Sequence, residues 1–166
     1  MNNTIDSTAT VFANTYVKAF ATQVTRINDF LANVSDEDLA RETAPGRNTG
    51  IYLLGHLAAS NDGILVLLGA SGKLYPQLEK LFLTSPDHSG AAYPTVQELK
   101  KYWNDVNAKL QAHFATLTPE EWLTRHTAVS EEDFAKEPHR NKLSIIVSRT
   151  THLSYHLGQL VYLKRK

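Results

Sequence analysis

The fold is decided by residues 50–68, which read GIYLLGHLAASNDGILVLL. Apolar side chains would lie on nearly every side of a helix built from this stretch, instead of forming one stripe. Such a helix is stable only when other elements surround it, so we expect a largely buried helix at the centre of the fold. Asn48 or Thr49 can cap its start, and Gly69 marks its end.

Three further long helices are predicted from apolar residues that recur at steps of three and four. They cover about residues 8–34, 95–117 and 141–165. Thr95 and Glu98 match a capping box at the start of the second of these helices. The last helix runs from about Asn141 to Arg165, and cations at its end suit a helix C-terminus.

The segments between the long helices contain short helices and loops. Capped turns are expected after Ser35, Thr118 and Ser130, and another short helix at residues 78–83. No segment alternates convincingly as a strand. The predicted fold class is therefore all-α: one four-helix-bundle domain over residues 1–166, with short extra helices in the loops. The loop lengths leave the order of helix packing open.

The composition excludes several classes of function. Lys+Arg and Asp+Glu balance at 17 each, so no charge field points to nucleic acid or to an anionic membrane. We find no apolar run long enough to span a bilayer and no signal peptide, and the expected compartment is the cytoplasm. The chain has no cysteine, so any thiol chemistry requires a thiol from outside it.

Two histidines four residues apart, His152 and His156, lie on one face of the last helix, about 40° from each other. Ile145 and Leu160 belong to the same arc, so this face points inward. Because burying an unpaired polar ring costs about 1–3 kcal/mol, each imidazole needs another side chain, a water or a metal ion as its partner. Gln159 is close enough on the helix to hydrogen-bond one of the rings.

A third inward histidine, His56, lies in the stretch that decides the fold. A lone histidine on an apolar face is usually hydrogen-bonded within the core, and three together can also satisfy one another and water. Together with His152 and His156, however, it forms a coherent metal site with a fourth position open for water or substrate. Zinc or nickel is the expected ion, with iron, manganese or copper as alternatives. Leu153 stands where the zincin motif requires Glu, so a peptidase is not expected.

The other histidines are assigned different roles. His88, His126 and His139 lie in predicted loops, where a solvated surface position is expected. His113 lies on an apolar stripe and is expected to be a core or pocket-wall residue, not a fourth ligand.

The back of the last helix carries the small residues Ser154 and Gly158. Val147, Val161 and Tyr162 extend this face with apolar surface. The predicted helix at residues 8–34, the one at residues 95–117, or a second subunit is expected to cover it.

Two blocks of the chain resemble the DinB/YfiT-like family. Residues 48–58, NTGIYLLGHLA, are similar to a block that ends in His-Leu-Ala, and residues 152–159, HLSYHLGQ, are similar to the family's His-x-x-x-His-x-Gly-Gln block. The resemblance covers essentially the whole chain. It implies a three-histidine divalent metal site inside a four-helix bundle, with His56, His152 and His156 as ligands, and it favours a homodimer.

Characterised members of that family include bacillithiol- and mycothiol-dependent S-transferases and a thiol-dependent isomerase. The resemblance therefore implies a metal-dependent enzyme that activates a low-molecular-weight thiol for reaction with a small-molecule substrate. The alternatives are a metal-dependent hydrolase that uses a metal-bound water, and a non-enzymatic metal- or ligand-binding stress protein. No carboxylate falls on the ligand faces, which counts against hydrolysis, and no catalytic acid or base can be named.

Overall fold

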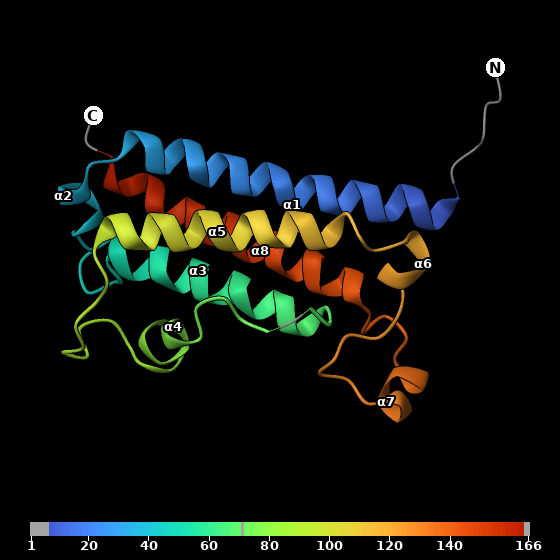
Figure 1. The fold of residues 1–166 in the computed structure, drawn as a ribbon. Coiled ribbons are helices and arrows are strands. Elements are labelled where there is room, and N and C mark those ends of the chain that lie inside the picture. Colours follow the sequence, from blue (N-terminus) through green and yellow to red (C-terminus); the bar gives the residue numbers. More distant parts are fainter. Residues whose placement is uncertain (1–6, 71, 165–166) are drawn as a thin grey trace, which may run out of the picture.

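The computed structural model describes residues 7–70 and 72–164, and its long helices form a four-helix bundle (Figure 1). The long helices are α1 (Thr8–Asn33), α3 (Gly50–Leu67), α5 (Val96–Phe114) and α8 (Lys142–Leu160). The short ones are α2 (Asp36–Leu39), α4 (Gln77–Glu79), α6 (Pro119–Trp122), α7 (Glu131–Lys136), the π-helical turn η1 (Lys80–Thr84) and the 3₁₀ turn η2 (Val161–Leu163). Within the described residues there is no strand. The predicted all-α class is confirmed.

Each long helix begins where a side chain can accept a hydrogen bond from an otherwise unpaired amide. Ser7 caps α1, Thr49 caps α3 and Asn141 caps α8, in each case by accepting from the amide three residues further on. The capping box predicted at Thr95 and Glu98 is present at the start of α5. These ends were predictable because a cap depends on only a few neighbouring residues.

The packing order, which the loop lengths left open, follows from which helices touch. α1 packs mainly on α8, and α3 packs mainly on α5. α3 also contacts α8, which brings the two histidine-bearing helices together. Figure 1 shows that α3 and α5 run in the same direction, because the long connection through α4 returns the chain to the end where α3 began.

α3 is the most buried of the long helices, as expected, and Leu54, Leu57 and Ile64 are completely buried. The sequence predicted no apolar run long enough to span a bilayer, and this needs correction. By length and composition alone, α3 is long and apolar enough to cross a membrane. In this bundle, however, 72% of that helix is buried by other parts of the chain, as in the core helix of a globular protein. The helix is therefore weak support for a membrane span.

The last α-helix ends earlier than predicted. It stops at Leu160 and tightens into the 3₁₀ turn η2, whereas the sequence predicted helix to Arg165, which lies outside the described residues. The tighter turn points Leu163 into the core, where its side chain is 1% exposed. Its carbonyl accepts a hydrogen bond of 3.3 Å from Nη1 of Arg41. Burial of Leu163 and this side-chain cap account for the change in helix type.

Within residues 7–70 and 72–164, no other helix covers the back face of α8. Val147, Val161 and Tyr162 are 38%, 48% and 76% exposed. The expectation that α1 or α5 covers them is wrong, since they stay exposed although α1 packs on α8, and α5 packs mainly on α3. Cover by a second copy of the chain stays a prediction.

Candidate metal centre

The structure brings His56 on α3 together with His152 and His156 on α8. Nε2 of His152 lies 3.0 Å from Nε2 of His56 and 3.0 Å from Nε2 of His156. One ring nitrogen from each of the three histidines lies within 4.8 Å of the other two. Within residues 7–70 and 72–164, no carboxylate joins this cluster.

The Nδ1 atoms of two of these histidines are held by hydrogen bonds. His56 Nδ1 donates to the backbone carbonyl of Phe82 in η1, at 2.9 Å. His156 Nδ1 donates to Oε1 of Gln159, at 2.7 Å, in agreement with the role expected for Gln159. With the proton on Nδ1, each ring directs its Nε2 lone pair into the cluster. His152 differs, because its Nδ1 is buried and has no hydrogen-bond partner in the part of the chain that the structure describes.

These contacts fit a bound cation. A neutral His152 that carries its proton on Nε2 can donate one hydrogen bond, yet two Nε2 acceptors face it. A divalent ion would use the lone pairs of all three Nε2 atoms. In a tetrahedral zinc site, with Zn–N distances of about 2.05 Å, neighbouring nitrogens are about 3.4 Å apart, so the two pairs at 3.0 Å would need to separate only slightly. The residues present therefore suit a metal ion, and their role as its ligands stays a prediction.

The electrostatics of the cluster keep the imidazoles neutral. Burial lowers the pKa of His56, His152 and His156, because it penalises the charged form. For His152 the pKa falls to about 3, since the other two rings and Arg149 add to the effect of burial. The hydrogen bonds to Phe82 and Gln159 oppose this lowering at His56 and His156. Neutral imidazole is the form that binds metals.

Gly55 leaves the space that η1 needs to form the hydrogen bond between His56 and Phe82. A Cβ atom at position 55 would lie 2.5 Å from Cζ of Phe82 and still closer to Cε1 of the same ring. The Phe82 side chain is completely buried. The missing side chain therefore lets η1 pack closely on α3 beside His56. A glycine inside a helical pattern indicates such a close approach but does not reveal the neighbour.

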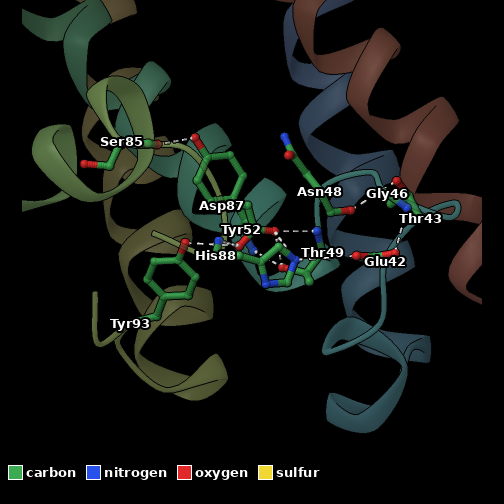
Figure 2. A network of polar contacts seen from close by, with 10 residues as sticks. All are labelled: Glu42, Thr43, Gly46, Asn48, Thr49, Tyr52, Ser85, Asp87, His88 and Tyr93. Carbon is green, nitrogen blue, oxygen red and sulfur yellow. Dashed lines mark hydrogen bonds and ion pairs between the residues drawn. The ribbon is translucent and has the colours of Figure 1, made fainter. Parts of the chain in front are cut away.

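A polar network ties the loop after η1 to the start of α3 (Figure 2). Asp87 accepts hydrogen bonds from the backbone amide and the hydroxyl of Thr49, at 2.7 and 2.9 Å, and from the hydroxyl of Tyr93, at 3.1 Å. Burial opposes ionisation of Asp87, but these hydrogen bonds prevail and hold its pKa below the ordinary value. Tyr52, whose ring lies parallel to that of His56, donates to the carbonyl of Ser85 at 2.8 Å. The network holds η1 in place beside the histidines.

Arg149 was missed in the sequence analysis. It lies on α8 one turn before His152, and its charge lowers the pKa of both His56 and His152. The helical arithmetic that paired the histidines also places Arg149, at about 60° from His152 and about 20° from His156. Helical phase is therefore the sequence signal that identifies this residue.

The remaining histidines lie outside the cluster. His88 and His139 are exposed in loops, as expected. His126 is only 9% exposed, so the surface position predicted for it is wrong. Its loop folds onto the end of α3, where the amide of Thr127 donates to the Leu67 carbonyl. His113 is partly buried beside a hollow of about 260 Å³ and its Nε2 has no partner, so it is a pocket-wall residue.

Comparisons with known proteins identify a family and a fold. The family model described as the DinB superfamily matches residues 19–160. Among solved structures, the chain is similar to a conserved protein from Enterococcus faecalis, with a TM-score of 0.64 and 18% sequence identity over 95% of each chain. At this identity the likeness shows the fold alone. No curated protein matches the chain.

Proposed function

The chain belongs to the DinB superfamily, and from this premise we propose that it is a divalent-metal-dependent enzyme that activates a low-molecular-weight thiol, as an S-transferase does. The observation that carries the proposal is the convergence of three imidazoles whose Nε2 atoms meet at one point. His56, His152 and His156 would hold the ion, with zinc or nickel as the first candidates.

A bound divalent ion supplies one chemical function here, which is to stabilise the deprotonated form of a thiol at neutral pH. The chain's own residues prepare the centre for that ion. Phe82 and Gln159 hold two imidazoles in the Nδ1–H form and orient their rings. Burial keeps the ligands unprotonated, so that protons compete weakly with the metal. The thiol must come from outside, because the chain has no cysteine.

Hydrolysis is the alternative, and the composition of the cluster counts against it. A hydrolase at this centre needs a positioned general acid or base. No Asp or Glu among the described residues belongs to the cluster. A thiol whose pKa is lowered by a cation becomes a nucleophile without such a base, which favours thiol chemistry. A non-enzymatic metal- or ligand-binding role is the third candidate, and the same assay separates it from both enzymes.

The test is a metal-reconstituted assay of thiol conjugation. The purified protein is loaded with zinc, nickel or cobalt and mixed with a small thiol, such as cysteine or mercaptoethanol, and a fluorogenic electrophile. We expect a metal-dependent rate that is lost in His56→Ala and His152→Ala and kept in His139→Ala, a matched control in an exposed loop.

Each other outcome of this assay selects one of the remaining candidates. A metal-dependent rate with esters but not with thiols would establish the hydrolase. A tightly bound metal with neither activity would leave the binding protein. Failure to bind any metal would exclude both enzymes and the metal-binding role.

A further inference from the structure

Arg149 is a partly buried cation beside the three histidines. It lies on the inward face of α8, one turn before His152 and two turns before His156. Helical phase places Arg149 about 20° from His156 and about 60° from His152, and its side chain is half-buried. The lowered pKa values of His56 and His152 agree with a positive charge on this face. The pKa of Arg149 is itself lowered by burial, which reports the loss of surrounding water.

No side chain of the described residues compensates this charge. Across residues 7–70 and 72–164, Arg149 has no ion pair with a carboxylate, whereas Arg41, Arg125 and Arg140 each have one. A partly dehydrated arginine without a counter-ion is costly to the folded protein.

A metal ion at the histidines would increase this imbalance. The three ligands are neutral, and no Asp or Glu of the described chain belongs to the cluster. The ion and the guanidinium would therefore add positive charges to the same face of α8, in a partly buried region. An anionic group on the incoming ligand would relieve this repulsion, and it would gain charge-assisted hydrogen bonds from the guanidinium.

We propose that Arg149 binds a carboxylate of the small molecule that occupies the three-histidine centre. The substrate is then a carboxylate-bearing thiol, whose sulfur would bind the ion and whose carboxylate would bind Arg149. This inference rests on the proposed function, because it assumes a small thiol at that ion.

The local structure favours a carboxylate over a phosphate. The planar guanidinium fork matches a carboxylate with two parallel hydrogen bonds. Phosphate sites commonly add free backbone amides at a helix N-terminus. Arg149 lies in the interior of α8, two turns beyond its start at Lys142, where the backbone amides are used by the helix.

The test compares two thiols that differ mainly in charge, mercaptoacetate and mercaptoethanol. Cobalt-loaded protein is titrated with each at neutral pH, and binding is followed by the near-ultraviolet band that appears when a thiol reaches cobalt. For each protein, the preference is the affinity for mercaptoacetate divided by the affinity for mercaptoethanol. This preference is expected to be about ten- to a hundredfold larger in the wild type than in Arg149→Met. Arg149→Lys, which keeps the charge but loses the fork, is expected to retain part of this preference, and Arg26→Met, an exposed arginine on α1, all of it.

Titration of the zinc-loaded protein with acetate and with inorganic phosphate, followed by the NMR signal of the arginine Nε–H groups, tests the anion site without a thiol. Saturable acetate binding that disappears in Arg149→Met supports the proposal even if neither thiol binds, an outcome that would overturn the proposed function alone. Equal preference for the two thiols in wild type and Arg149→Met would overturn the role of Arg149 and leave thiol activation intact. Tighter binding of phosphate than of acetate would overturn the carboxylate assignment. If Arg149→Met does not fold, Arg149→Lys takes its place in each comparison.

Discussion

Gly55→Ala tests whether close packing of η1 on α3 prepares the metal centre. The new Cβ would lie 2.5 Å from Cζ of Phe82, and ordinary van der Waals contact begins at 3.4 Å, so the ring must withdraw by about 0.9 Å. If η1 moves with the ring, the distance from His56 Nδ1 to the Phe82 carbonyl grows from 2.9 Å to about 3.8 Å, beyond hydrogen-bond range.

Two energetic consequences of Gly55→Ala follow. Overpacking costs about 1–3 kcal/mol, and about 1 kcal/mol returns because alanine favours the helix, so the free energy of unfolding should fall by about 0–2 kcal/mol. Loss of the hydrogen bond that orients His56 should weaken metal affinity by about ten- to a hundredfold. Urea unfolding of the metal-free protein measures the first effect, and competition with a chromophoric chelator measures the second.

Gly63→Ala is the matched control, since it makes the same change on the same helix. A Cβ at Gly63 meets no atom within 4 Å, so this variant should be as stable as wild type or more stable by up to about 1 kcal/mol, with unchanged metal affinity. Replacing Phe82 by the smaller Leu in the Gly55→Ala background should restore part of the lost stability. If Gly55→Ala matched Gly63→Ala in both measurements, the steric account of position 55 would be refuted.

Three further predictions follow from the surroundings of the histidines. Gln159→Leu should lower metal affinity about ten- to a hundredfold in the chelator competition assay, because His156 loses the acceptor that fixes its proton on Nδ1. The free energy of unfolding of the metal-free protein should fall as the pH drops below 6.5. The pKa values of His56, His152 and His156 are lower in the folded chain than in the unfolded chain, so the unfolded chain binds protons first and is stabilised by acid. Urea titrations at about pH 7.5 and about pH 5 check this, and the slope should shrink in His152→Ala. Asp87→Asn should reduce the free energy of unfolding by about 1–3 kcal/mol at neutral pH, since Thr49 and Tyr93 lose a charged acceptor. Thermal unfolding measures this loss of stability, and an unchanged unfolding midpoint would contradict the prediction.

Helix capping and helical periodicity, which depend on residues close in sequence, were enough to predict the long helices and the pairing of His152 with His156. The capping box of Thr95 and Glu98 involves residues close in sequence, and its prediction is confirmed. His152 and His156 share a face because helical periodicity requires it. The hypothesis that the three histidines share a partner predicted that His56 lies near this pair. The contact between α3 and α8 brings them together.

Features that depend on long-range packing were not predicted. The carbonyl of Phe82 reaches His56 only because η1 packs against Gly55, and nothing near Phe82 in the sequence indicates that contact. His126 was assigned to the surface because its segment is polar, but hydrogen bonds from Thr127 to the end of α3 bury it. The end of α8 depends on Arg41, more than a hundred residues away. Such contacts are set by tertiary structure, which overrides local preference.

Metal content of the purified protein tests the central claim most directly. Wild type, the triple variant His56→Ala/His152→Ala/His156→Ala and the control His139→Ala are each incubated with zinc, freed of excess ion and examined by elemental analysis and circular dichroism. We predict about one tightly bound ion per chain in wild type and in His139→Ala, and none in a folded triple variant. A wild-type protein that retains no ion, or a triple variant that retains as much as wild type, would contradict the assignment of these three histidines as a metal centre.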